Sequence, residues 1–310
     1  MVKLRILFAL CALFLSACEE PPPASPDEAS LQPEIVWELQ IEEPSGLAAL
    51  PDGRLLSVGD GDRGIVYELA VNGEQLSVTP AKFNLREFGH LPHADFPDKQ
   101  APDLEGIAPT RDGRLAVAAE YWNEIWEIDP RLKVVVGLWR FPEIENDGSI
   151  AECLGPTRNH GAEGVAFDPL RGIVLGIQER CPPGLVIFEE KSGRAKRTFA
   201  RAALDERLGH ATPRYQITTG TLSGAAWAGR AGAFYLLDRL RRHIILLEVG
   251  PDFEITEKSR WSFAGTFIER GKHAQYGNAE GIALAGDKLY LISDPGEGAT
   301  SQLARFALPR

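Results

Sequence analysis

Five segments of the chain share one order of apolar and polar positions. In each, a serine or glutamate and a glycine lead into a short apolar run, and turn signals such as Asp52-Gly53 and Asp112-Gly113 separate it from the next. A second apolar run and a third run, rich in β-branched and aromatic residues, follow in each segment. A fourth run fits before the next segment, for example over residues 134–141. Short runs joined by tight turns predict antiparallel strands, and no segment shows a sustained helical period.

The five segments are repeats of one unit. Their anchoring glycines stand 57 to 60 residues apart, at Gly46, Gly106, Gly164, Gly224 and Gly281. Four strands per unit, repeated five times, are typical of a propeller, in which four-stranded sheets surround a central channel. We therefore predict an all-β fold, a five-bladed β-propeller of four-stranded antiparallel blades.

The fifth repeat runs out of chain after its third strand. Residues 34–41 (EIVWELQI) precede the first glycine in the same phase as the outer strands of the other repeats. We expect this N-terminal strand to complete the last blade and to close the ring, which leaves no long unpaired edge. The propeller domain is accordingly predicted to span residues 34–310.

Residues 1–17 have the pattern of a signal peptide. Lys3 and Arg5 precede an apolar run over 6–15 that is too short to span a bilayer. The ending LSAC resembles the lipobox of bacterial lipoproteins, which implies cleavage before Cys18 and lipidation of that cysteine. An ordinary secretory cleavage beside a chance cysteine is the alternative. Residues 18–33, rich in proline and acids, predict an extended tether.

These features place the protein in the cell envelope, anchored to a membrane through the lipid on Cys18. Glu19 follows the cysteine, and by resemblance to bacterial sorting rules this favours the outer membrane, facing the periplasm or the cell surface. Of the four cysteines, Cys11 leaves with the signal peptide. Cys153 and Cys181 remain in an oxidising compartment, where we expect a disulfide between them.

The acidic balance of the chain restricts its partners. The formal net charge is −11, and removal of Lys3 and Arg5 with the signal peptide brings it to −13. Nucleic acid is therefore excluded as a partner of the whole domain, whereas cations are favoured. We expect a monomer. No GxSxG, Walker, HExxH or CxxC motif is present, so these enzyme classes have no support.

Acidic residues form two columns through the repeats. The residue before each anchoring glycine is Ser45, Glu105, Glu163, Ser223 or Glu280; the exits of the second strands carry Asp60, Glu120, Glu179, Asp238 and Asp294. The start of one antiparallel strand lies beside the end of the next, so both columns should share one face near the axis. Crowding of carboxylates is costly unless a cation neutralises them, and Ca²⁺ is the best candidate. The alternative is a solvated acidic rim.

Other polar residues fall near the same predicted face. His160 lies in a connection that enters this face, and Arg180 and Arg239 follow acids of the second column. In a catalytic site, Arg180 or Arg239 would hold an anion, Glu163 or Glu120 would act as ligand or base, and His160 would carry a proton. Ion pairing with the acids is the more common role of such arginines.

Four motifs, DLEGIA, NHGAEGVAFDP, LSGAAWAGRAGAFYLLD and AEGIALAGDKLYLISDP, carry a family resemblance. With them the chain resembles the SdiA-regulated propeller family and the related domain called esterase-like activity of phytase. The resemblance implies a propeller with a metal near its axis, ligated at Glu105, Glu163, Glu280 and the second acid column. Fold similarity by itself does not establish catalysis.

Three functions fit these observations. The first is a Ca²⁺-dependent hydrolase of a phosphoester or related ester, acting on a small anionic ligand. The second is a non-catalytic envelope module, in which the metal stabilises the ring and the acidic face docks a protein, a glycan or a cation. The third and least supported is a sugar lactonase, for which Asn159 and Asn278 would be suitably placed.

Overall fold

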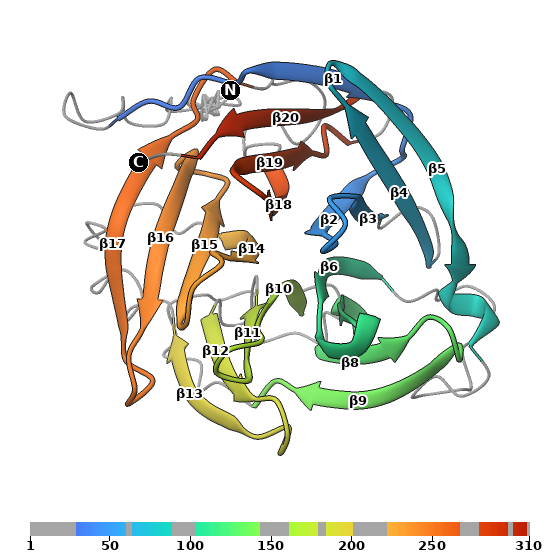
Figure 1. Cartoon of the computed structure of the whole chain (residues 1–310). Coiled ribbons are helices and arrows are strands. Elements are labelled where there is room, and N and C mark those ends of the chain that lie inside the picture. The colour runs from blue at the N-terminus through green and yellow to red at the C-terminus, as the bar shows by residue number, and fades with distance from the viewer. Residues whose placement is uncertain are drawn as a thin grey trace, which may run out of the picture.

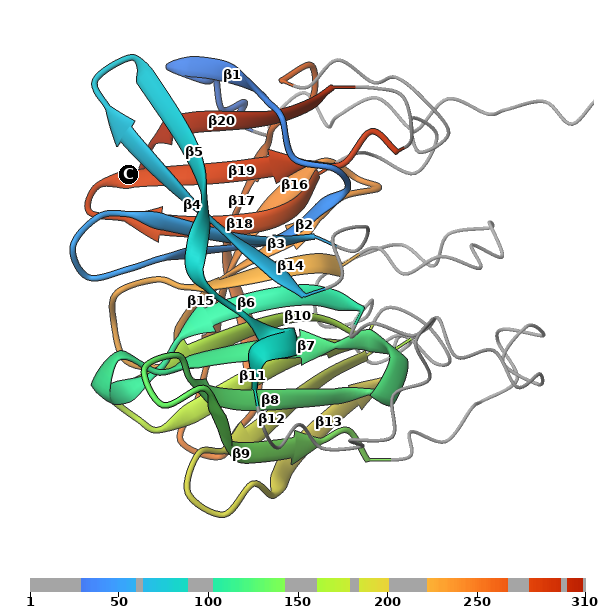
Figure 2. The same cartoon turned by 90° about the vertical axis from the view of Figure 1, so that its right-hand side faces the viewer.

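The computed structural model describes residues 29–59, 64–88, 103–142, 161–178, 184–200, 222–266, 279–296 and 300–308. These residues form five four-stranded antiparallel sheets arranged radially around one axis, as the sequence predicts (Figure 1). Figure 2 shows the disc from its edge, with the strands running across its thickness. None of the described residues forms a helix that is long and apolar enough to cross a membrane.

Each blade runs outward from the axis in chain order. Blade 1 contains β2 (Pro44–Ala49), β3 (Leu55–Gly59), β4 (Ile65–Asn72) and β5 (Gln75–Asn84). Blade 2 contains β6 (Leu104–Pro109), β7 (Leu115–Ala119), β8 (Glu124–Asp129) and β9 (Val134–Arg140). Blade 3 contains β10 (Ala162–Asp168), β11 (Ile173–Gln178), β12 (Gly184–Glu189) and β13 (Ala195–Ala200).

The last two blades follow the same order, except that the outer strand of blade 5 is β1 from the N-terminal part of the chain. Blade 4 contains β14 (Leu222–Trp227), β15 (Ala233–Asp238), β16 (His243–Val249) and β17 (Ile255–Ser262). Blade 5 contains β18 (Ala279–Ala285), β19 (Lys288–Ser293), β20 (Ser301–Ala307) and β1 (Ile35–Leu39). The described helical elements are single 3₁₀ turns, η1 (Leu85–Glu87), η2 (Arg111–Gly113) and η3 (Glu120–Trp122).

The N-terminal strand closes the ring as predicted. β1 pairs antiparallel with β20, in a register that runs from Ile35 opposite Arg305 to Leu39 opposite Ser301. The attachment begins earlier than expected, because Ser30 forms a parallel bridge with Ser262 at the end of β17. The Leu31 amide donates to the Ser262 carbonyl at 2.7 Å. Residues 29–31, assigned to the tether by composition, therefore bind blade 4 through their backbone.

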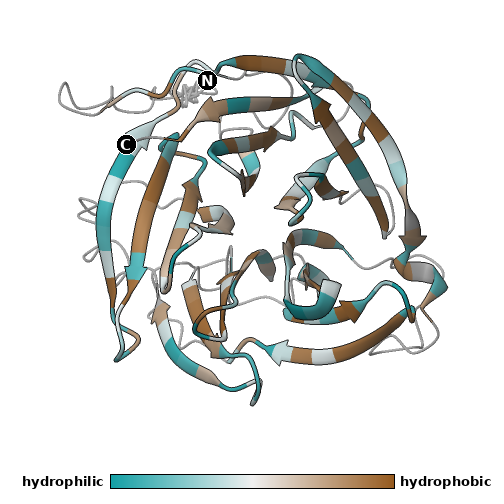
Figure 3. Cartoon of the chain, viewed as in Figure 1, coloured by the Kyte–Doolittle hydropathy of each residue, from teal (hydrophilic) through white to brown (hydrophobic). Residues whose placement is uncertain are grey.

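The hydrophobic core is divided into five clusters, one between each pair of neighbouring blades. Leu175 and Leu236 share the cluster between blades 3 and 4, and Val58 and Val117 share the one between blades 1 and 2. Figure 3 shows the apolar positions spread over the strands of every blade, with hydrophilic residues frequent on the outer strands β13 and β17. Adjacent blades are thus held together by apolar burial.

The anchoring glycines permit the inner strands to meet. A Cβ added at Gly106 would lie 2.8 Å from the Glu163 carbonyl oxygen, and one at Gly281 would lie 2.7 Å from the Ser45 carbonyl oxygen. At Gly46 and Gly224 an added Cβ would likewise lie 2.8 Å from a carbonyl oxygen of the next blade, and at Gly164 it would lie 3.3 Å from the Ser223 carbonyl oxygen. Any larger residue would push the inner strands apart, which explains the regular spacing of glycine in the sequence.

Candidate metal centre

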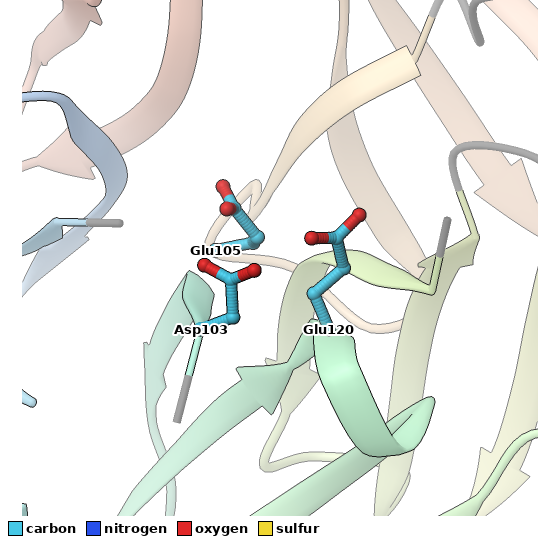
Figure 4. A group of neighbouring side chains, drawn as sticks. All are labelled: Asp103, Glu105 and Glu120. Carbon is cyan, nitrogen blue, oxygen red and sulfur yellow. The ribbon is translucent and has the colours of Figure 1, made fainter. Parts of the chain in front are cut away.

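Three carboxylates converge at the start of blade 2. Asp103 directly precedes β6, Glu105 lies in β6, and Glu120 opens η3 after β7. One ligand oxygen from each lies within 4.8 Å of the other two. Figure 4 shows the three side chains rising into one space. Within the ranges that the structure describes, no other three His, Cys, Asp or Glu side chains come together in this way.

Local backbone irregularities place these side chains. The pairing of β6 with β7 shifts register between Leu104 and Gly106, so Glu105 is the extra residue of a β-bulge. The Glu120 amide donates to the Asp103 carbonyl at 2.9 Å, which ties the start of the inner strand to the end of the second. Bulges re-aim a side chain without ending the sheet. Glu105 is thereby held beside the two other acids.

The same bulge recurs in every blade. The register of the inner strand shifts at the residue before the anchoring glycine, that is at Glu163, Ser223 and Glu280 as well as in blades 1 and 2. We call the face of the disc on which inner strands begin and second strands end the acidic face. A β-bulge that is repeated in every blade therefore shapes this face.

A single helical turn positions Glu120. Its carbonyl accepts a hydrogen bond from the Asn123 amide at 2.9 Å, and Asn123 ends η3 in the left-handed conformation at φ 53°. Asparagine tolerates this conformation better than most residues, which favours a short and sharp turn. Gly161 lies against the same carbonyl, where an added Cβ would be 2.1 Å from the oxygen. Blade 3 thus holds η3 in place.

The electrostatics of the cluster suit a hard cation. Glu120 is only 4% exposed, and the Oδ1 atom of Asp103 is buried with no hydrogen-bond partner among the described residues. Neighbouring carboxylates repel one another, and a buried acceptor without a donor is costly. A bound cation with a preference for oxygen would relieve both costs. The three acids therefore fit a metal and could hold one.

Other predicted ligands on the acidic face already contact cations of the protein. Glu280 is 7% exposed, and both of its carboxylate oxygens lie 2.6 Å from Arg239 Nη1. Asp238 accepts from Arg241 through the amide at 3.0 Å and through Nη1 at 3.1 Å. Arg239 thus adopts the ion-pairing role that is common for arginines beside acids, reaching from blade 4 to blade 5.

The remaining members of the two columns differ in their surroundings. Glu163 is buried at the start of β10, and Asp294 accepts from the Gly296 amide at 2.7 Å. The Ser223 hydroxyl donates to the Ala279 carbonyl at 2.9 Å, so this non-acidic position joins blades 4 and 5. The other predicted site residues, Asp60, Glu179, Arg180, His160, Cys153, Cys181 and Cys18, lie outside the described residues.

Sequence reasoning found two of the three converging acids, Glu105 and Glu120, and missed Asp103. The two columns were found by comparing equivalent positions of the repeats, and the positions equivalent to Asp103 hold Glu43, Gly161, Thr221 and Asn278. Because this position is not shared among the repeats, their comparison does not single out Asp103. The signal was present in the motif DLEG, where Asp103 stands two residues before Glu105.

Fold and site together define a five-bladed propeller with a carboxylate cluster on one face near its axis. The family described as "Phytase-like: Esterase-like activity of phytase" matches residues 40–184, which include all of blade 2 and its three acids. The resemblance seen in the sequence is confirmed over this stretch. No curated protein matches the chain.

The chain is similar to several solved structures at low sequence identity. A chain of the mitotic checkpoint complex matches with a TM-score of 0.50 and 11% identity over 100% of both chains, which shows the fold alone. Virginiamycin B lyase from Staphylococcus aureus matches at 13% identity and TM-score 0.41, covering 89% of this chain and 75% of the lyase. The PQQ-bound aldose sugar dehydrogenase from Streptomyces coelicolor matches at 13% and 0.44, covering 92% and 99%.

Proposed function

We propose that this protein is a calcium-binding propeller of the cell envelope, anchored through Cys18, that hydrolyses a phosphoester or a related ester at its acidic face. The observation that carries the proposal is the convergence of Asp103, Glu105 and Glu120 within a stretch that matches the phytase-like family. Three oxygen ligands on rigid strand ends suit Ca²⁺, which is abundant outside the cytoplasm. When bound, Ca²⁺ would supply Lewis-acid polarisation of a substrate oxygen.

The chain's own residues have separate tasks in this proposal. Asp103, Glu105 and Glu120 bind the ion, and the enclosure of Glu120 keeps water from competing for its oxygens. Arg239 is on the same face, and its guanidinium would orient an anionic substrate group while it remains paired with Glu280. Glu163, at the head of the neighbouring inner strand, is the candidate base for a proton from attacking water.

The test is metal binding followed by turnover. Purified protein is titrated with Ca²⁺ by calorimetry, and a panel of phosphoesters and carboxylic esters is then assayed with and without chelator. We expect Ca²⁺ binding, turnover of at least one substrate class, and loss of turnover in the chelator. Asp103→Asn should weaken Ca²⁺ binding at least tenfold, whereas Asp287→Asn, whose side chain is 86% exposed on another blade, should bind like the native protein.

One observation favours a second function, a non-catalytic envelope module with a structural metal. The buried pair of Arg239 and Glu280 neutralises part of the acidic face with a cation of the protein itself. In such a module the ion at Asp103, Glu105 and Glu120 would do the same for blade 2. Tight Ca²⁺ binding that raises Tm, with no turnover of any panel member, would reject the hydrolase and support this alternative.

A further inference from the structure

The turns on the face opposite the acidic face are divided by charge. Nine described turns lie there, each joining a first strand to a second or a third strand to a fourth (left-hand side of Figure 2). In blades 1, 4 and 5 they carry two cationic and five acidic side chains: Arg54, Arg230, Asp52, Glu74, Asp252, Glu254 and Asp287. In blades 2 and 3 they carry two acidic and seven cationic side chains: Asp112, Glu190, Arg111, Arg114, Arg131, Lys133, Arg171, Lys191 and Arg194. A chain with a net charge of −11 thus places an excess of positive charge on the turns of two neighbouring blades.

The four turns of blades 2 and 3 form one surface. Leu115 pairs with Ile128 in the sheet, so the turn before β7 and the turn after β8 are neighbours. Across the blade boundary, the Glu190 amide donates to the Gly172 carbonyl at 2.9 Å, and Arg111 Nε donates to Glu190 Oε1 at 2.9 Å. We call this continuous surface the basic patch, which comprises residues 110–114, 130–133, 169–172 and 190–194.

Cationic groups form the outer layer of the basic patch. The Arg131 side chain is 68% exposed, whereas its partner Asp129 is 3% exposed. Arg111 is 46% exposed, and its carboxylate partner on the turn after β12 is 15% exposed. The same turn adds two exposed cations, Lys191 and Arg194. Because the paired acids lie deeper than the guanidinium groups, the solvent-facing surface is positively charged.

Two leucines are exposed within the basic patch. Leu132 is 69% exposed on the turn after β8, and Leu170 is 64% exposed on the turn after β10. Of the residues that the structure describes, one other large hydrophobic side chain is exposed, Val136 on β9, and it also belongs to blade 2. Exposed apolar residues scattered singly over a protein are ordinary, whereas their concentration at one place marks an interaction surface.

We infer that the basic patch docks on a membrane surface that contains anionic phospholipids. Its arginines and lysines contact the headgroup phosphates, and Leu132 and Leu170 enter the boundary between headgroups and acyl chains. A soluble polyanion would use the cations but not the leucines, so the combination favours a lipid surface. Docked in this way, the acidic face points away from the membrane and stays open to ligands in solution.

The inference rests on the envelope location proposed above, and the length of the tether is compatible with it. Ser30 is bridged to Ser262 at the end of β17, and eleven residues, 18–28, separate it and Ala29 from the start of the mature chain. Eleven extended residues span up to about 40 Å. Strands of six to eight residues, as in blade 4, are only about 20 to 26 Å long. A lipid on Cys18 can therefore reach the plane of the opposite face.

The experiment measures binding to vesicles without the lipid anchor. The full mature chain carrying Cys18→Ser is sedimented with vesicles of phosphatidylcholine, or of an equal mixture of phosphatidylcholine and phosphatidylglycerol. Chelator is present throughout, so Ca²⁺ cannot bridge the acidic face to the lipid. We expect binding to the mixed vesicles, at least tenfold weaker binding to phosphatidylcholine alone, and loss of binding as salt is added. Absence of binding to the mixed vesicles, or equal binding to both, would overturn the inference.

Two variants divide the binding between charge and apolar contact. Lys191→Glu/Arg194→Glu reverses two exposed charges of the basic patch and should weaken binding to mixed vesicles at least tenfold. Leu132→Ser/Leu170→Ser keeps every charge and should also weaken binding at least tenfold, because the apolar contact is lost. Undiminished binding by the leucine variant would indicate a general polyanion surface and would reject docking on lipid.

The matched control is Arg54→Glu/Arg230→Glu, which reverses the same number of charges on turns of blades 1 and 4 of the same face. This control should bind mixed vesicles at close to the native level. An equal loss in the control would show that only the net charge of the chain matters and would reject the basic patch as the docking site. Because chelator is present in every measurement, neither Ca²⁺ binding nor ester hydrolysis at the acidic face affects these results.

Discussion

Gly161 lies so close to Glu120 that a Cβ on the glycine would stand 2.1 Å from the glutamate carbonyl oxygen. The contact joins the entrance of blade 3 to the single helical turn that carries a candidate metal ligand of blade 2. Because both partners at this contact are backbone, neither can yield by rotating a side chain. The position of Glu120 therefore depends on a neighbouring blade having no side chain at one residue.

Replacement of Gly161 by alanine should displace η3 and weaken Ca²⁺ binding at least tenfold, as measured by calorimetry. The control is Gly53→Ala, in the turn after β2, where φ is 87° and no atom lies within 4 Å of an added Cβ. That control should lose about 1 kcal/mol of stability through backbone strain and keep its Ca²⁺ affinity. Native affinity in Gly161→Ala would contradict the role assigned to this contact.

Removing only Arg239 from the buried pair of Arg239 and Glu280 should cost more stability than removing both partners. Arg239→Met leaves a buried carboxylate without its cation and should lower the free energy of unfolding by about 3 to 5 kcal/mol in denaturant titration. The double variant Arg239→Met/Glu280→Met should lose less, because no isolated charge remains. If added Ca²⁺ restores Arg239→Met but not the double variant, Glu280 can serve as a ligand, as the sequence predicted.

Closure of the ring should depend on pH through Glu34. A hydrogen bond from Lys288 at 2.6 Å, together with the charges of Lys288 and Arg305, holds the pKa of Glu34 below its usual value. A carboxyl with a lowered pKa stabilises the fold fully above its unfolded-state pKa, ~4.3 for glutamate, and loses this contribution as pH falls through the lower folded value. The pair is partly exposed, so the effect should stay below about 1 kcal/mol.

Glu34→Gln tests this closure contact. Denaturant unfolding between neutral pH and pH values below the ordinary glutamate pKa should show a smaller acid-induced loss in the variant than in the native protein. Glu38→Gln, which removes the same charge from an exposed position on β1, should follow the native curve. Parallel curves for native protein and Glu34→Gln would show that this contact contributes nothing.

The contact between Gly281 and blade 1 should be intolerant of any side chain. A Cβ there would lie 2.7 Å from both the Ser45 carbonyl oxygen and the Leu47 amide nitrogen. Gly281→Ala should cost about 3 kcal/mol or more in urea titration, since the overlap can be relieved only by moving backbone. Gly286→Ala in the turn of the same blade, with open space around it, should cost about 1 kcal/mol. Equal losses of stability in Gly281→Ala and Gly286→Ala would contradict the close approach of the inner strands at Gly281.

The sequence by itself determined the architecture, because every blade packs against its neighbours in the same way. Each inner strand meets the next blade at a glycine, and each strand buries apolar side chains against a neighbour, so the requirement appears in the sequence as a period. Closure by β1 was readable for the same reason, since residues 34–41 repeat the phase of the outer strands. The signal peptide, the lipid on Cys18 and the disulfide remain predictions of the sequence.

Only the tertiary structure decided which acids act together. Repeated positions suggested one ring of carboxylates, but Glu280 is paired with Arg239, and the cluster in blade 2 includes the unrepeated Asp103. The attachment of residues 29–31 to β17 uses backbone hydrogen bonds, which leave no hydrophobic pattern to read. The β-bulge recurs with the repeat, whereas pairings across blades depend on the reach of individual side chains, which spacing along the chain does not encode.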